Sequence, residues 1–267
     1  SQRNDFDFRN AAGRELPFPS SHLLHSISVN IELINTGSEL LLGRVLNTHQ
    51  QWICRRLADL GCIVNRQVAV PDTAHDIQQA VRDALGRAEL VIVTGGLGPT
   101  SDDVTRELIA QLLGKKLVLD EQVFSYIKQF FASRKRAMPA NNEVQAMVPE
   151  GAMVLWNPNG TAPGLAMEVG PSEDGSWSTE AGKPSLPPSS IRHPQSSSRK
   201  QWLIMLPGPP RELRPMFDTT VLPLVQREFP PAATFVCRTL RTTGLGESAA
   251  QEKVKVPLDA LVAAGLE

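Results

Sequence analysis

A glycine-rich turn followed by two adjacent carboxylates has the composition of a phosphate and metal site. Residues 90–105 read LVIVTGGLGPTSDDVT, so apolar β-formers lead into the turn and residues 102–113 are predicted to form the next helix. Glycines allow a backbone to approach a ligand closely, and a helix N-terminus offers unpaired N–H groups to phosphate. The competing interpretation is an ordinary strand–turn–helix junction with an Asp cap. The candidate phosphate-binding residues of this turn are Thr94, Gly95, Gly96, Gly98 and Thr100.

Carboxylates in two separate loops could hold a divalent cation between them. Asp102 and Asp103 would lie at the positive end of the predicted helix, where anions are stabilised. Glu39 belongs to a loop that follows a predicted strand over residues 29–35 and that, alone, is better explained as a turn with a solvated Glu. Because both loops follow strands of one predicted sheet, Glu39 and Asp103 should face each other and supply hard oxygen ligands. The residues of the first loop assigned to phosphate or ribose are Thr36, Gly37 and Ser38.

Three further turns carry candidate ligand contacts. Asn47 opens a predicted helix over residues 47–60, either as a plain cap or as a contact to the ligand, and neither interpretation is favoured. Two rigid turns further along could be structural, or their backbone N–H groups could complete a phosphate cradle. His49 and His75 show no spacing typical of a metal site or a catalytic triad. The candidate residues of the two rigid turns are Asn159, Gly160, Thr161, Pro207 and Gly208.

Strands and helices alternate along the first part of the chain, which predicts a three-layer α/β/α fold with a mostly parallel sheet. In such sheets ligands bind at the carboxyl ends of the strands, which places the two acidic loops on one rim. The predicted strands cover residues 29–35, 62–70, 90–93, 153–156, 165–169 and 202–206, and the predicted helices cover residues 47–60, 74–87, 102–113, 118–134, 141–148 and 211–228.

Composition and charge argue against several classes of protein. The 267-residue chain is 41% hydrophobic and 21% charged, and its net charge of -1 gives no electrostatic case for binding nucleic acid or an anionic membrane. No apolar run reaches the length of a membrane span. Three cysteines without CxxC spacing indicate a reduced, cytoplasmic protein rather than a disulfide scaffold or a zinc site.

Three segments depart in composition from the domain predicted over residues 29–230. Residues 1–28 are polar and are expected to form a disordered tail rather than a secretion signal. Residues 170–200 are rich in Ser and Pro, and we expect a disordered insertion at the tip of a hairpin. The alternative is a partner-binding segment around a minimal PxxP at residues 184–187. Residues 231–267 resemble the truncated start of a second small domain.

Five motifs follow one another within residues 29–248: GSELLLG with NT and W, TGGLGPTSDDVT, MP with NN, NPNGTAPG and LPGPPREL. In sequence and in order, these motifs resemble those of the CinA family. The resemblance implies a molybdopterin-binding-type fold, shared with the MogA and MoaB proteins. It also implies hydrolysis of ADP-ribose with a divalent metal (Mg²⁺ or Co²⁺) and K⁺, and a homo-oligomer, expected to be a dimer. The nicotinamide mononucleotide deamidase domain of many members has no match here, whereas GLGES at 244–248 resembles the start of their linking domain.

The leading hypothesis is a metal-dependent nucleotide pyrophosphatase acting on ADP-ribose-type dinucleotides. Glu39 and Asp103 would be the catalytic carboxylates and would hold the cation together with Asp102, which is also the candidate helix cap. The resemblance places the shared acidic position at Asp103. The first alternative is a pterin- or nucleotide-binding module without turnover. The second is an interaction module whose functional part is the Ser- and Pro-rich insertion.

Overall fold

Two compact units make up the chain in the computed structural model. The larger unit, Ser28–Cys237, contains every predicted site residue. The described part of the smaller unit consists chiefly of one helix, α8 (Glu247–Ala263). The predicted N-terminal tail and all but the ends of the Ser- and Pro-rich insertion lie outside the described residues, so the structure does not bear on those two expectations. The described residues are 29–170, 200–230 and 243–263.

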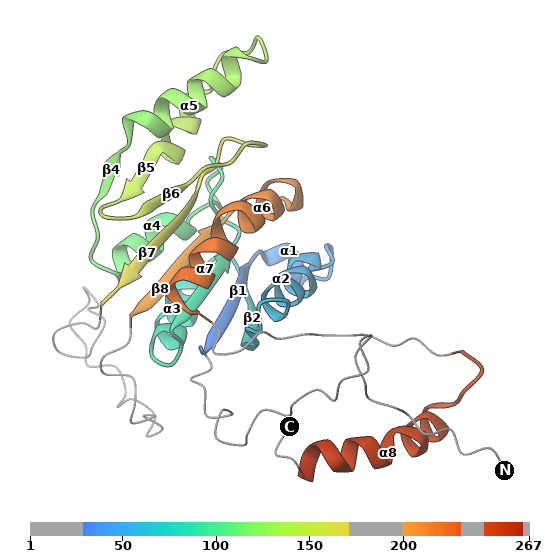
Figure 1. Cartoon of the computed structure of the whole chain (residues 1–267). Coiled ribbons are helices and arrows are strands. Elements are labelled where there is room, and N and C mark those ends of the chain that lie inside the picture. Colours follow the sequence, from blue (N-terminus) through green and yellow to red (C-terminus); the bar gives the residue numbers. More distant parts are fainter. Residues whose placement is uncertain (1–28, 171–199, 231–242, 264–267) are drawn as a thin grey trace. The chain divides into compact units, whose positions relative to one another are not determined.

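A six-stranded mixed sheet forms the centre of the larger unit (Figure 1). Its strands are β1 (Ile31–Thr36), β2 (Val64–Val70), β3 (Leu90–Thr94), β6 (Met153–Leu155), β7 (Gly164–Val169) and β8 (Gln201–Leu206). They follow the order β2-β1-β3-β8-β7-β6. The first four are parallel, whereas β7 pairs antiparallel with both β8 and β6. The predicted hairpin between β7 and β8 is therefore confirmed, with Val169 opposite Gln201 at the end from which the insertion leaves the sheet.

The central strands are buried because helices cover both faces of the sheet. Every residue of β1 and β3 is buried, and β8 is buried after its first residue. Near-continuous apolar runs such as that of β3 are typical of parallel strands covered on two sides. The buried carboxylate of Glu32 in β1 is paired with the guanidinium of Arg87 (Oε2–Nη2 2.9 Å). β2 has exposed residues in its middle, as expected for an edge strand.

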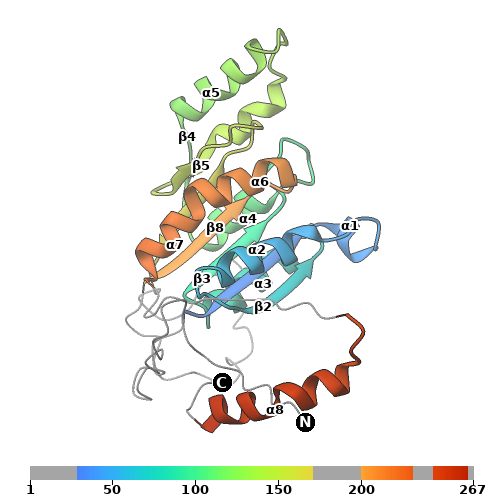
Figure 2. The ribbon, with the colours of Figure 1, turned by 45° about the vertical axis from the view of Figure 1, so that its right-hand side comes forward.

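Helices pack on both faces of this sheet, which confirms the predicted three-layer arrangement (Figures 1 and 2). The helices of the larger unit are α1 (Ser38–Leu41), which has no buried residue, and α2 (Thr48–Ala58), α3 (Ala74–Leu85), α4 (Thr105–Leu112), α5 (Glu121–Ala132), α6 (Pro210–Met216) and α7 (Leu222–Glu228), which contribute to the two cores. Neighbouring strand residues point to opposite faces, so Val91 joins a core with α3, α4 and α5, while Ile92 joins a core with α2, α6 and α7. The single helix predicted over 211–228 is interrupted between α6 and α7 by a π-helical turn, Phe217–Val221.

The turn before α4 differs from the prediction. Helix α4 begins at Thr105 and its N-cap is Val104, and among the described residues no side chain caps that N-terminus. The expected Asp102 cap is therefore wrong, and both acidic residues lie in the turn ahead of the helix. The physical reason is local. The Asp103 carboxylate accepts a hydrogen bond from the N–H of Thr100 (3.0 Å) and so closes a turn. A side chain that bonds within this turn competes with capping of the helix that follows.

Two short apolar stretches form a second sheet that the sequence did not predict. β4 (Leu117–Leu119) pairs antiparallel with β5 (Met147–Pro149). The helix predicted from residue 118 therefore starts at Glu121, and the helix predicted over 141–148 is a 3₁₀ helix that ends where β5 begins. Strands of three residues are too short to show the alternation of apolar and polar residues that is typical of strands. The apolar pattern therefore cannot distinguish them from the ends of helices.

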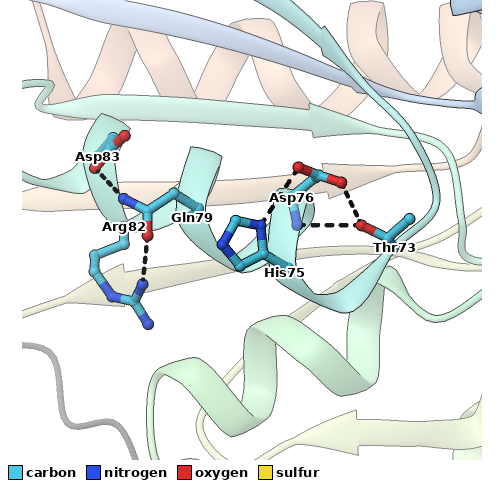
Figure 3. Close-up of polar contacts among 6 residues, drawn as sticks. All are labelled: Thr73, His75, Asp76, Gln79, Arg82 and Asp83. Carbon is cyan, nitrogen blue, oxygen red and sulfur yellow. Dashed lines mark hydrogen bonds and ion pairs between the residues drawn. The ribbon is translucent and has the colours of Figure 1, made fainter. Parts of the chain in front are cut away.

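Thr73 caps the N-terminus of α3, close to the end of β2 (Figure 3). Its hydroxyl accepts a hydrogen bond from the N–H of Asp76 (3.3 Å) and donates one to the Asp76 carboxylate. The bond from Thr73 lowers the pKa of the Asp76 carboxyl. His75 is exposed beside Asp76, outside the residues that line the cavity described below.

Thr73→Ala should lower the free energy of unfolding by about 1 kcal/mol, because it removes an N-cap. Thr73→Ser keeps the hydroxyl and should have little effect. Urea unfolding followed by circular dichroism measures both variants. An equal loss in the Ser variant would show that the methyl group, rather than the cap, stabilises the helix.

Candidate functional site

A cavity of about 380 Å³ lies at the carboxyl ends of three adjacent parallel strands. Thr36 ends β1, Gly95 follows β3 and Pro207 follows β8, and all three residues line the cavity. This is the position at which open parallel sheets bind ligands. The structure therefore brings most of the predicted site residues together. Those on the cavity wall are Thr36, Gly37, Glu39, Gly95, Gly96, Gly98, Asp102, Asp103, Thr161, Pro207 and Gly208.

Other predicted site residues lie behind this wall or away from it. The N–H of Ser38 donates to the carboxylate of Asp72 (2.8 Å), so Ser38 fixes the loop that carries Glu39. Thr94 is buried at the end of β3, where its hydroxyl donates to the Asn35 side chain (3.0 Å). Asn47 caps α2 through its side chain and lines a separate depression of the surface.

The glycine loop is pressed against its neighbours so closely that side chains would not fit. Gly95 and Gly96 have φ values of 101° and 65°, a region that favours glycine. A Cβ on Gly95 would lie 2.6 Å from the carbonyl oxygen of Thr36, and one on Gly98 would lie 2.2 Å from the Asp103 carboxylate. The backbone of the loop therefore forms the cavity wall, as a phosphate-binding loop requires.

Thr100 organises the two carboxylates that follow the glycine loop. Its N–H donates to Asp103 (3.0 Å), and its hydroxyl lies within hydrogen-bonding distance of both Asp102 and Asp103. Hydrogen bonds to a carboxylate favour the charged form. The contact from Thr100 accordingly lowers the pKa of the Asp102 carboxyl, so this group is ionised at neutral pH.

Five carboxylates line the cavity, and no Lys, Arg or His is present among the described residues of its wall. The five are Glu39, Asp72, Asp102, Asp103 and Glu212. Such a wall repels an anion that arrives without a cation. Carboxylate oxygens are the ligands that hard divalent cations prefer, so the donor set fits such an ion. In the part of the chain that the structure describes, no three His, Cys, Asp or Glu side chains form a ready-made metal site, so water or ligand oxygens would have to complete the coordination.

Glu212 is a buried residue of the cavity wall that was not among the predicted site residues. Its carboxylate accepts a hydrogen bond from the Asn157 side chain (2.8 Å), which also donates to the carbonyl of Ala162 (2.8 Å). A Cβ on Gly160 would lie 2.1 Å from the Glu212 carboxylate, so this turn is packed tightly on α6. Asn159 donates to a carbonyl of α6 as well (2.8 Å). The turn over residues 157–162 therefore fixes Glu212.

Asp72 is the second wall carboxylate that was not predicted. It accepts a hydrogen bond from the N–H of Ser38, and its own N–H donates to the Ser38 hydroxyl (3.2 Å). Asp72 comes two residues after β2, so the strand-end rule that selected the other loops could have found it. The only signal for Glu212 was its place after β8, within the LPGPPREL motif.

His49 connects α2 to the cavity wall through a hydrogen bond between its Nε2 and the carbonyl of Gly208. Burial lowers the pKa of the imidazole below its ordinary value of 6.5. The hydrogen bond to Gly208 raises that pKa, whereas the charge of Arg214 lowers it further. The net shift is downward, so His49 is neutral in the folded protein at pH 7.

Acidification should destabilise the fold through His49. As the pH falls below about 6.5, His49 of the unfolded chain takes up a proton, whereas the folded chain binds that proton only at a lower pH. The unfolded state then carries more protons, so the free energy of unfolding decreases through this window and is unaffected above it. Urea unfolding of wild type and His49→Gln between about pH 7.5 and pH 5 measures the effect. A stability difference between the two that does not vary with pH would contradict it.

Comparisons with known proteins agree with the geometry. Residues 32–227 match the sequence profile described as "Probable molybdopterin binding domain". The crystal structure of the protein CinA from Thermoplasma acidophilum is 30% identical and has a TM-score of 0.58, covering 73% of this chain and 98% of that chain. The chain belongs to the CinA family. The resemblance drawn from the ordered motifs is thereby confirmed, as is the fold that it implied.

Curated relatives of this CinA-family chain are longer than the chain itself. One from Symbiobacterium thermophilum is 44% identical over 82% of this chain and 45% of its own length. A CinA-like protein of Akkermansia muciniphila is 41% identical over 85% of this chain and 48% of its own length. The chain thus spans about half the length of the curated relatives it matches. Within the described ranges, none of its helices has the length and apolar character needed to cross a membrane.

Proposed function

We propose that this CinA-family domain hydrolyses the pyrophosphate bond of ADP-ribose-type nucleotides with the help of a divalent cation. The observation that supports this is the cavity wall, where a glycine loop meets five carboxylates and where the described residues include no basic side chain. The negative charge of a polyphosphate bound there must be compensated. Backbone N–H groups carry partial positive charge, and a divalent cation would supply the remainder. The cavity volume of about 380 Å³ falls within the range of small-ligand sites, about 300–1,000 Å³.

Some groups of the wall would contact the cation and others the nucleotide. Glu39 and Asp103 would hold the cation with Asp102 close by, and water or ligand oxygens would complete the coordination. The cation would neutralise pyrophosphate oxygens and lower the pKa of a bound water. The backbone of the glycine loop would contact phosphate, and the hydroxyls of Thr36 and Thr161 would contact the rest of the nucleotide. In the reaction, the oxygen of water forms a bond to one phosphorus and the bridging P–O bond breaks. ADP-ribose then yields AMP and ribose 5-phosphate, and the protons of the attacking water pass to the medium.

Hydrolysis of ADP-ribose by the purified chain tests the proposal. Chromatography should detect AMP when Mg²⁺ or Co²⁺ is present, with K⁺ varied separately, and should detect none when a chelator removes the divalent ion. Excess metal should restore the rate. Turnover that persists in chelator would show that the divalent cation is not required. Failure to hydrolyse ADP-ribose or any related dinucleotide pyrophosphate would show that the proposed enzymatic activity is wrong.

A second candidate is a pterin- or nucleotide-binding module without turnover. The match to a molybdopterin-binding profile favours it, and so does the lack of a ready-made cluster of metal ligands among the described residues. Calorimetry with ADP-ribose and with molybdopterin, run beside the hydrolysis assay, separates the two candidates. Saturable binding of either compound without product would favour the binding module.

A further inference from the structure

We propose that His49 is a positioning residue that fixes the turn Pro207–Pro210, which forms one wall of the cavity. His49 lies in the first turn of α2, and its Nε2 hydrogen-bonds to the carbonyl of Gly208. A carbonyl oxygen can only accept, so Nε2 carries the proton. The other ring nitrogen, Nδ1, is buried and has no hydrogen-bond partner among the described residues. The bond to Gly208 is therefore the contact that orients the ring.

The turn itself has one flexible residue between fixed ones. Its sequence is Pro-Gly-Pro-Pro, and the ring of each proline fixes its φ near −65°. Gly208 is therefore the residue whose φ is free to vary, and it also carries the one N–H group of the turn. An acceptor contact on the Gly208 carbonyl limits this freedom. His49 supplies that contact from a different element of the fold.

The orientation of Gly208 matters because this residue lies beside the glycine loop. A Cβ built on Gly208 would lie 3.8 Å from the Cα of Gly95, and both glycines line the cavity. The N–H of Gly95 also donates to the carbonyl of Leu206, directly before the turn (2.9 Å). A change in the Gly208 conformation would therefore change the width of the cavity where the two loops meet.

Helix α2 is a firm support for this contact. One turn after His49, the ring of Trp52 packs edge-on against Phe217, with 5.4 Å between ring centroids. A further turn along, Arg56 forms an ion pair with Asp218 (2.8 Å). The same helix face thus contacts the π-helical turn that follows α6. These contacts hold the backbone of α2 in place. Loss of the His49 N–H donor should therefore change the conformation of the turn Pro207–Pro210 rather than that of α2.

Amide hydrogen exchange in the full chain tests this role without any ligand. His49→Leu removes the donor, whereas His49→Gln keeps an amide N–H that can reach the same carbonyl. The N–H groups of Glu212 and Leu213 donate to the carbonyl of Pro209 in the turn (2.9 and 3.0 Å). We expect about tenfold faster exchange at these two amides in the Leu variant, and wild-type rates in the Gln variant, as for the loss of one hydrogen bond. Exchange in β1 serves as the internal reference, because it should not change. Wild-type exchange in the Leu variant, or equally fast exchange in both variants, would overturn the proposal.

A second substitution distinguishes a positioning contact from simple packing. Alanine at 208 narrows the φ range, and its Cβ would meet the Cα of Gly95 only at an ordinary contact distance of 3.8 Å. Gly208→Ala in the His49→Leu background should therefore slow exchange at Glu212 and Leu213 again. If His49 served only to fill space, alanine at 208 would not restore the rate. Unchanged exchange in the double variant would therefore count against the proposal.

Binding of ADP-ribose with Mg²⁺ gives a readout that also rests on the proposed function. The dissociation constant should rise about tenfold in His49→Leu and stay near the wild-type value in His49→Gln. Equal affinity in wild type and His49→Leu would overturn the role of His49 at the site. If the wild-type chain binds no ADP-ribose, the proposed substrate is wrong, and the exchange experiment alone decides the role of His49.

Discussion

Asp103→Asn should reduce the rate of ADP-ribose hydrolysis by about two to three orders of magnitude while leaving the fold intact. Asparagine keeps an oxygen that can accept the hydrogen bond from the N–H of Thr100, so the acidic turn should persist. The negative charge that a divalent cation requires is lost. Initial rates at saturating Mg²⁺ measure the effect, and thermal unfolding shows whether the fold survives. Glu39→Gln should change the rate in the same direction, because Glu39 reaches the cavity from the other loop.

Asp76→Asn is the matched control for this substitution. Asp76 also accepts a hydrogen bond from a threonine, but it lies on α3 and does not line the cavity. Its replacement removes one charge from the protein and should leave the rate at the wild-type value. A wild-type rate in Asp103→Asn would exclude Asp103 from cation binding, and an equal loss in Asp76→Asn would show that net charge alone is responsible.

Gly95→Ala should lower the free energy of unfolding by about 3 kcal/mol, from overpacking together with the left-handed φ. A Cβ there would lie 2.6 Å from both the carbonyl oxygen and the hydroxyl of Thr36. The carbonyl belongs to a central strand and cannot move aside as a flexible side chain would. For a domain of this size, each kcal/mol lowers the melting temperature by about 2–4 °C. Thermal or urea unfolding measures the change.

Gly208→Ala, on the loop that faces Gly95, is the control. Its Cβ would meet the Cα of Gly95 at 3.8 Å, which is ordinary van der Waals contact, and its φ is not left-handed. We expect a change within about 0.5 kcal/mol, as for substitutions without a steric cause. If both variants lost stability equally, the contact between Gly95 and Thr36 would not be the reason.

Long elements could be predicted from the sequence because their apolar patterns extend over several turns or over whole strands. Helix α3 buries Ile77, Val81 and Leu85 at helical spacing, and β3 is an uninterrupted apolar run. The strands β4 and β5 have three residues each, and their pairing joins positions about thirty residues apart in the chain. A local pattern carries no information about such a partner.

The candidate site was predictable where it follows the strand ends and hidden where it depends on packing between distant elements. The loops of Glu39 and Asp103 follow β1 and β3, so topology alone brought them to one rim. The contact of His49 with Gly208 joins positions 159 residues apart, and that of Asn157 with Glu212 joins positions 55 residues apart. Both contacts depend on how α2 and α6 pack against the sheet. The spacing of motifs along the chain does not predict this packing.

The negative wall of the cavity has a consequence for the order in which the proposed ligands should associate. The negative wall repels a nucleotide whose phosphates are not bound to a cation, whereas it attracts a divalent ion. For the proposed hydrolysis we therefore expect the ion to arrive first, or the ion and the nucleotide to arrive as one complex. Because monovalent salt screens these charges over a Debye length of about 8 Å at physiological ionic strength, the association rate of the free ion should fall as salt rises. The acidic wall should thus favour the association of a metal–nucleotide complex over that of the free nucleotide.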